Sequence, residues 1–137
     1  MNNLRKLIRE KGHKVTPARI VILDIFTKGK EPLDASFIYK KIKNKIKNIN
    51  EATVYRTLTF FEAAGILKKV DLRKNSIYFE LADKHHHHIV CTKCDTVEDF
   101  ENTAIEKIIN TIVEKSSAFK KIKDHSLELF GLCQKCS

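Results

Sequence analysis

The chain has 137 residues, 42% of them apolar, and a formal net charge of +9, which suits one domain or two small ones. It begins without the apolar run of a signal peptide and has no stretch long enough for a membrane span, so we expect a cytoplasmic protein. Residues 1–80 hold 18 Lys and Arg against 8 Asp and Glu, whereas residues 81–137 hold 8 against 9. This asymmetry favours a nucleic-acid-binding first half, although a merely solvated basic surface would have the same composition.

The first half predicts four helices, each with a recognisable start or stop signal. The first ends at Gly12, and the second opens at Thr16, a capping residue followed by proline. Asp34 is a cap for the third helix. The fourth begins after Asn50 and ends at Gly65, where a left-handed cap is expected. Its apolar stripe at helical spacing consists of Val54, Leu58 and Phe61.

A hairpin is expected after these helices. Residues 66–70 and 76–81 have strand character and flank a polar turn at 71–75. Four basic helices followed by a hairpin outline a winged helix-turn-helix domain over residues 1–81. The polar residues 82–84 are then a hinge between two domains.

The second half, residues 85–137, predicts a small α/β domain. Strands are expected within 89–100, interrupted by a cysteine turn, and a last strand at 126–132. Residues 103–115 predict a helix that buries four isoleucines at positions 105, 108, 109 and 112. The whole chain is therefore expected to belong to the α+β class.

All four cysteines occur in Cys-x-x-Cys pairs, Cys91 with Cys94 and Cys133 with Cys136. One tight turn can direct two sulfurs at a common point, and two such turns complete a tetrahedral zinc site. Four thiolates leave no open position, so the zinc would be structural. A redox pair would explain one of the motifs but not both, and a fortuitous arrangement is the remaining alternative.

Histidines are the second group of potential metal ligands, and four of them are consecutive at 85–88. In an extended segment His86 and His88 point to one side while His85 and His87 point to the other, so one run can serve two sites. Glu80, Asp99, Glu106 and His125 are further candidate ligands. Mixed imidazole and carboxylate ligands suit Zn²⁺, Fe²⁺, Ni²⁺ or Mn²⁺. The alternative is a solvated histidine-rich loop.

Together these residues resemble the ferric uptake regulator (Fur) family over nearly the whole chain. The stretches that carry the resemblance are 14–19 (KVTPAR), 52–58 (ATVYRTL), 64–66 (AGI), 78–81 (YFEL), 85–94 (HHHHIVCTKC) and 125–136 (HSLELFGLCQKC). The resemblance implies a dimeric, metal-activated repressor that binds palindromic operator DNA, with a winged-helix domain and an α/β dimerisation domain.

The resemblance also implies three metal sites. The structural zinc site would consist of Cys91, Cys94, Cys133 and Cys136. A sensory site between the two domains would include Glu80, His86, His88 and Asp99, with Fe²⁺ favoured and Zn²⁺ or Mn²⁺ as alternatives. An additional site within the dimerisation domain would consist of His85, His87, Glu106 and His125. His87 stands where many members of the family have Asp.

Two features of the sequence bear on which metal is sensed. The family usually supplies a sensory-site histidine from the loop that here reads residues 28–33 (KGKEPL), and this loop contains none. Glu31 could replace it, or the site could be four-coordinate. Peroxide-sensing members tend to have Asp where this chain has Asp99, whereas iron-regulating members often have Glu. Metal-catalysed histidine oxidation is therefore an alternative function.

The fourth helix is the candidate recognition helix for DNA. With its apolar stripe turned inward, Thr53, Arg56, Thr57 and Phe60 are expected to face outward, with Tyr55 on the flank. The resemblance implies Tyr55 and Arg56 as groove contacts, and Lys14 and Arg19 near the DNA backbone or minor groove. The lysines at 40, 41, 43, 45 and 47 could add non-specific affinity, or form a solvated face.

Two other classes of protein are alternatives to a DNA-binding regulator. A zinc-dependent hydrolase would need an open metal position, but the sequence has no His-Glu-x-x-His motif and only four glycines, none in a phosphate-binding loop. We therefore expect no enzymatic activity. A zinc-stabilised RNA-binding protein fits the helix and hairpin pattern less well, and competition between duplex DNA and RNA would distinguish it.

Overall fold

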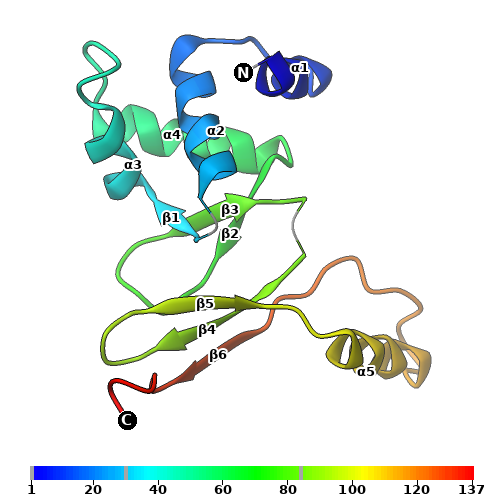
Figure 1. The fold of residues 1–137 in the computed structure, drawn as a ribbon. Helices are drawn as coiled ribbons and strands as arrows, with labels where there is room; N and C mark the ends of the chain where they lie inside the picture. Colours follow the sequence, from blue (N-terminus) through cyan, green and yellow to red (C-terminus); the bar gives the residue numbers. More distant parts are fainter. Residues whose placement is uncertain (1, 30, 84) are drawn as a thin grey trace. The chain divides into compact units, whose positions relative to one another are not determined.

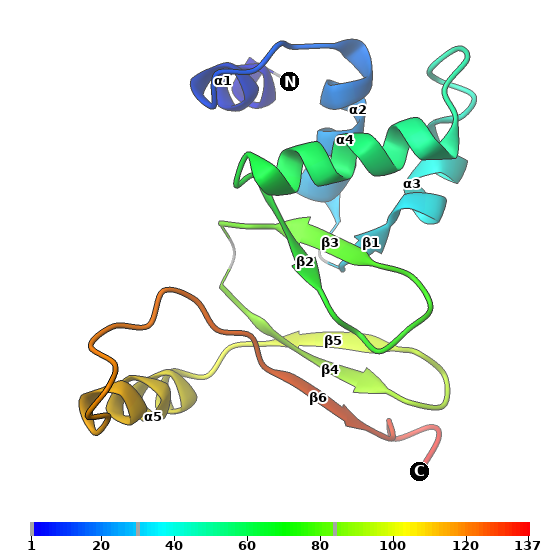
Figure 2. The same ribbon diagram turned by 180° about the vertical axis from the view of Figure 1, so that it is seen from behind.

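The fold consists of two compact units, Met1–Lys84 and His85–Ser137, in a computed structural model that describes residues 2–29, 31–83 and 85–137. Figures 1 and 2 show the order of the elements along the chain. The first unit contains α1 (Asn2–Glu10), α2 (Pro17–Lys28), β1 (Leu33–Asp34), α3 (Ala35–Ile42), α4 (Glu51–Ala63), β2 (Leu67–Val70) and β3 (Tyr78–Leu81). The second contains β4 (His87–Cys91), β5 (Val97–Phe100), α5 (Thr103–Glu114) and β6 (Glu128–Gly131).

The helices of the first unit begin at the predicted caps. The side chains of Thr16, Asp34 and Asn50 accept hydrogen bonds from the backbone N–H three residues further on, at 3.2, 2.9 and 2.8 Å respectively. These bonds satisfy N–H groups that have no partner within the helix. At the far end of α4, Gly65 has φ +75°, a left-handed conformation that glycine adopts without strain.

The helices enclose one apolar core with a small antiparallel sheet of order β1-β3-β2. The predicted stripe of α4 is fully buried, with Val54, Leu58 and Phe61 each 0% exposed. The predicted hairpin is also present as β2 and β3, although its connection is longer than expected and spans residues 71–77. The sequence did not predict β1, because two residues are too few to display the alternation of a strand.

The second unit is built on a sheet of order β5-β4-β6, in which β4 pairs antiparallel with β5 and parallel with β6. Its buried apolar side chains among the described residues are Val90 and Cys91. So small an apolar core contributes little hydrophobic free energy, so other interactions must stabilise this unit.

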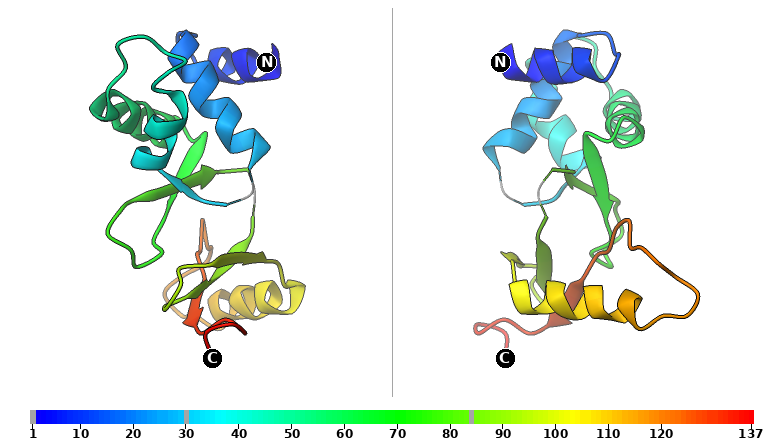
Figure 3. Two further views of the ribbon diagram at one scale, coloured as in Figure 1. Left: turned by 60° about the vertical axis from the view of Figure 1, so that its left-hand side comes forward. Right: turned by 90° about the vertical axis from the view of Figure 1, so that its right-hand side faces the viewer.

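Helix α5 is present where it was predicted, but the prediction that its isoleucines are buried is wrong for the single chain. Ile108 and Ile112 are 61% and 62% exposed, Ile105 and Ile109 are partly buried, and no residue of α5 is fully buried. Figures 1 and 3 show α5 set beyond the end of the sheet where β5 ends and β4 begins. The helical pattern thus identified the apolar face of α5 correctly, but it could not show that this face is left exposed in the single chain.

The predicted hinge, residues 82–84, falls where the first unit ends. Ala82 and Asp83 form a turn after β3, and Lys84 lies outside the described residues. None of the helices formed by the described residues has the length and apolar character needed to span a lipid bilayer.

Candidate metal centres and DNA-binding surface

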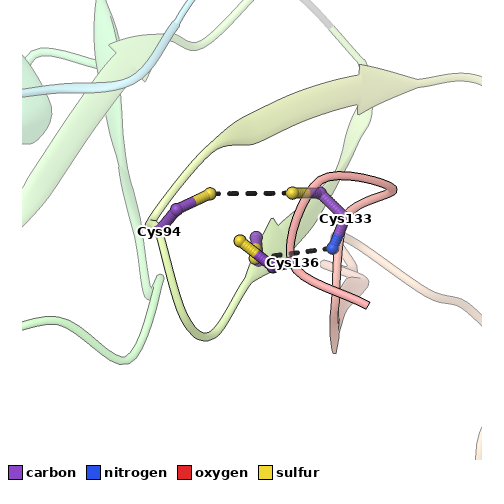
Figure 4. Close-up of side chains that lie close together, drawn as sticks. Cys94, Cys133 and Cys136 are labelled. Carbon is purple, nitrogen blue, oxygen red and sulfur yellow. Dashed lines mark hydrogen bonds between the residues drawn. The ribbon is translucent and has the colours of Figure 1, made fainter.

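The four cysteines meet at one end of the sheet of the second unit. Strand β4 ends at Cys91, and its parallel partner β6 ends at Gly131, which pairs with Cys91 in register. The turns that follow the two strands therefore lie side by side, and each carries one Cys-x-x-Cys pair. Figure 4 shows the sulfurs of Cys94, Cys133 and Cys136 gathered between these turns.

The spacing of the sulfurs fits a tetrahedral zinc ion. The four sulfurs lie within 4.8 Å of one another, and the Sγ atoms of Cys94 and Cys133 are 3.7 Å apart. Zinc–sulfur bonds of about 2.3 Å place neighbouring sulfurs of a tetrahedron about 3.8 Å apart. A disulfide would require about 2.05 Å, and all four cysteines are free thiols.

Hydrogen bonding within the cysteine cluster splits the pKa values of its thiols. The backbone N–H of Cys133 lies 3.4 Å from the sulfur of Cys91, and hydrogen bonds of this kind lower the pKa of Cys91 to about 6. Hydrogen bonding with Cys133 and then Cys94 raises the pKa of Cys136 to about 12. Four neighbouring thiols cannot all ionise without a compensating cation, so this donor set fits a divalent metal.

The histidine run alternates as predicted, and this divides its side chains between two clusters. The rings of His85 and His87 are 5.2 Å apart on one side, and those of His86 and His88 are 4.9 Å apart on the other. The strand geometry of β4 and of the segment before it produces this separation, because successive side chains of an extended chain point in opposite directions.

The first of these clusters surrounds the carboxylate of Glu106 on α5. Its Oε1 lies 2.6 Å from Nε2 of His87, and its Oε2 lies 3.0 Å from Nε2 of His85 and 2.8 Å from Nε2 of His125. All three rings present the same nitrogen. The hydrogen bond from His87 contributes most to lowering the pKa of Glu106 to about 2, with His85 and His125 acting in the same direction. Three imidazoles and an ionised carboxylate are a ligand set for a transition-metal ion.

The second cluster contains His86, His88 and Asp99. The Nε2 atoms of the two histidines lie 3.9 and 3.7 Å from the Asp99 carboxylate oxygens. These distances are too long for hydrogen bonds but suit groups that share a metal, and Oδ1 of Asp99 is buried without a hydrogen-bond partner among the described residues. His88 pairs in register with both Asp99 and Glu128.

The remaining predicted ligand, Glu80, belongs to the first unit. It lies on β3 opposite Lys68 of β2, and its Oε1 is 3.4 Å from the ammonium nitrogen of Lys68. Glu31, the suggested replacement for the missing loop histidine, is exposed in the connection between α2 and β1. Its carboxylate therefore has access to solvent.

Sequence reasoning missed Glu128 as a neighbour of the second histidine cluster. Its Oε1 lies 3.8 Å from Nδ1 of His88, on the side of the ring away from the nitrogen that faces Asp99. A carboxylate in this position can orient a metal-binding histidine. The parallel pairing of β4 and β6 brings Glu128 there, and the linear spacing of 40 residues gives no local signal for it.

The predicted DNA contacts lie on α4, on the first turn of α2 and in the connector between α1 and α2. Tyr55 is 39% exposed, Arg56 and Lys14 are exposed, and Thr53 and Arg19 are partly exposed. Nη2 of Arg56 donates to the hydroxyl of Thr53, 3.2 Å away on the preceding turn. These side chains are available on the surface of the basic unit.

Phe60 was expected to face outward from α4, and this expectation is wrong. Its ring is partly buried against the core, and its centroid lies 5.6 Å from that of the tilted Phe61 ring. The guanidinium of Arg19 covers it, with the guanidinium carbon 3.8 Å from the ring centroid. Phe60 lies on the last turn of α4, where His13 of the connector before α2 and Arg19 of the first turn of α2 contact its ring. An aromatic ring covered in this way is not free to contact a thymine methyl group.

Known proteins similar to this chain identify the family to which it belongs. The profile described as "Ferric uptake regulator family" matches residues 10–130. The ferric uptake regulation protein of Neisseria meningitidis is 41% identical over 98% of this chain and 93% of its own length. The peroxide operon regulator of Bacillus subtilis is 30% identical over 95% of this chain and 88% of its own length. The ferric uptake regulator of Helicobacter pylori, a structure described as having three functional metal-binding sites, superposes with a TM-score of 0.82 at 29% identity, covering 98% of this chain and 89% of that one. The chain therefore belongs to the ferric uptake regulator family.

Proposed function

We propose that this protein is a metal-dependent repressor that binds operator DNA as a homodimer when a sensory divalent metal, Fe²⁺ foremost, is bound. The observation that carries the proposal is the division of one histidine run between two ligand clusters, in the same unit as a third cluster of four thiols. A solvated histidine-rich loop would not place carboxylates against both faces of the run, as Glu106 and Asp99 are placed here.

Three groups of residues would hold metals in this proposal. Cys91, Cys94, Cys133 and Cys136 would hold structural zinc, and the second unit depends on this because its apolar core is so small. His86, His88 and Asp99 would hold the sensory metal together with Glu80, as the family resemblance implies. His85, His87, Glu106 and His125 would hold a further ion.

The sensory metal would supply a link between the two domains. Glu80 belongs to residues 1–81, the proposed DNA-binding domain, whereas the other three sensory ligands belong to residues 85–137, the proposed dimerisation domain. Shared ligation would restrict the hinge at 82–84 and so fix the separation of the two recognition helices in a dimer. DNA half-sites spaced by about one helical turn, or a multiple of it, require that separation to be fixed.

The dimer is supported by the exposed apolar face of α5. Ile108 and Ile112 are each more than half exposed, and Phe119 in the following segment is 70% exposed. Apolar side chains that recur at helical spacing normally face a partner surface. A second copy of this chain is the partner that the family membership supports.

A metal titration of DNA binding tests the proposal. We expect Fe²⁺ or Mn²⁺ to raise the affinity of the zinc-containing protein for its operator about 100-fold, within the usual range of coupling between two sites. The operator can be obtained by selecting duplexes from a random-sequence pool with metal-loaded protein, and fluorescence anisotropy under anaerobic conditions measures the affinity. DNA affinity that stays the same at every metal concentration would reject the proposal.

Arg56 provides a separate prediction for the DNA contact. Arg56→Ala should weaken operator binding by about 1–3 kcal/mol and relax base preference at one position in each half-site, because arginine reads guanine with two hydrogen bonds. The matched control is Lys69→Ala, which also removes one exposed positive charge but from β2. Equal losses in the two variants, with base preference unchanged in both, would mean that Arg56 acts only through its charge.

Peroxide sensing is a second candidate function, and Asp99 is the observation that favours it. This residue stands beside both His86 and His88, and the peroxide-sensing relatives tend to have Asp here. Exposure of the Fe²⁺-loaded protein to peroxide, followed by mass spectrometry of the peptide that contains His86, separates the two functions. Addition of one oxygen atom to a histidine at stoichiometric peroxide would indicate a peroxide sensor.

A further inference from the structure

The connector between α1 and α2 is fixed at both of its ends by hydrogen bonds. After α1, the N–H of Gly12 donates to the carbonyl of Arg9 at 2.8 Å, and the N–H of His13 donates to the carbonyl of Ile8 at 3.1 Å. This is a Schellman cap, and the φ of +77° at Gly12 allows it. At the other end, Thr16 caps α2. Lys14 and Val15 are the two residues between these caps.

The ring of Phe60 on α4 holds the middle of this connector. The His13 ring meets it edge to face, with the centroids 4.4 Å apart. The guanidinium of Arg19, from the first turn of α2, lies over the same ring at 3.8 Å. An aromatic ring attracts both a positively charged plane above its face and the edge of another ring.

Arg19 then fixes the backbone of Lys14. Its Nη1 donates a hydrogen bond to the carbonyl oxygen of Lys14 at 2.7 Å. Phe60 is thus linked through Arg19 to Lys14, whose own side chain is exposed. The planar, always charged guanidinium suits this role, because it can stack on a ring while it donates in its own plane.

We propose that Phe60 is a positioning residue for DNA binding, which acts through Arg19 to hold Lys14 in place for contact with the DNA phosphate backbone. This inference rests on the proposed DNA-binding function. A cation that is already held in position loses less conformational freedom on binding than one on a free loop. Phe60 therefore contributes to DNA affinity although its ring is partly buried and contacts no base.

A double-mutant cycle tests the link between Phe60 and Lys14. The probe is a duplex selected from a random-sequence pool by the full-length protein loaded with zinc and Mn²⁺. Lys14→Ala should weaken binding about tenfold and reduce the slope of log affinity against log salt by about 1. Phe60→Leu should weaken binding about fivefold and reduce the same slope. Phe60→Tyr, which keeps the aromatic face, should leave both the affinity and the slope at their wild-type values. In the Lys14→Ala background, Phe60→Leu should change the affinity less than about twofold.

Lys11→Ala is the matched control, because Lys11 is an exposed lysine of the same connector without the contact to Arg19. The fold-changes in DNA affinity caused by Lys11→Ala and by Phe60→Leu should multiply in the double variant, because the two residues act independently. Phe60→Met keeps apolar volume without the aromatic face and replaces Phe60→Leu if the latter melts below the assay temperature. Effects of Phe60 and Lys14 that also multiply would overturn the inference while leaving the proposed function intact. Failure of the wild-type protein to select any duplex would overturn both.

Discussion

Replacing Cys91 by serine is expected to release the structural zinc and unfold the second unit, residues 85–137. This is the largest effect that we predict for a single substitution. Structural zinc sites supply about 10–16 kcal/mol of apparent binding free energy, whereas a whole domain is stable by about 5–15 kcal/mol. Among the described residues of this unit the buried apolar side chains are Val90 and Cys91, so the sheet has little else to stabilise it.

Three measurements would follow the consequence of the Cys91→Ser substitution. Elemental analysis should show the loss of about one zinc per chain, hydrogen exchange should rise through β4, β5 and β6, and light scattering should show loss of the dimer. Lys93→Ala is the control, because Lys93 is exposed between Cys91 and Cys94 and changes none of the four sulfurs. If Cys91→Ser retains both its zinc and its hydrogen-exchange protection, the four thiols are not a structural metal site.

Glu80→Gln is expected to abolish the response of DNA affinity to the sensory metal while leaving zinc bound. An amide of the same shape is a much poorer ligand than a carboxylate, so the metal could no longer hold Glu80 of the first unit together with ligands of the second. The affinity gain of about 100-fold on adding metal should fall to less than about threefold. Asp99→Asn should likewise abolish the metal response, because it removes a proposed sensory ligand that belongs to the second unit.

The control for these variants is Glu98→Gln. Glu98 is the neighbour of Asp99 on β5, and it is exposed and pairs with Ile89 instead of His88. It should therefore keep the full metal response and the zinc content of the wild type. A Glu80→Gln protein that still responds fully, when Asp99→Asn does not, would place the sensory metal within the second unit alone and remove the proposed link between the domains.

Those features of the fold that depend on near neighbours could be predicted from the sequence. A cap requires a side-chain oxygen three residues before the N–H that it accepts from, so Thr16, Asp34 and Asn50 each carry their own signal. The alternation of His85–His88 is equally local, because it follows from the period of an extended chain. Cys-x-x-Cys spacing likewise makes each pair of sulfurs predictable.

The tertiary structure alone decided which of these local features meet. Parallel pairing of β4 with β6 brings Cys91 next to Cys133 and Glu128 next to His88, across 42 and 40 residues of chain. The fold of α2 and α4 turned Phe60 inward under Arg19, although its helical position suggested an outward direction. The isoleucines of α5 form an apolar face that the single chain does not cover. The sequence by itself therefore determined the helices, the hairpin of β2 and β3 and the cysteine and histidine motifs, since these depend on short-range spacing. Only the fold determined the partners of those ligands, because contacts between distant segments depend on the packing of the whole unit.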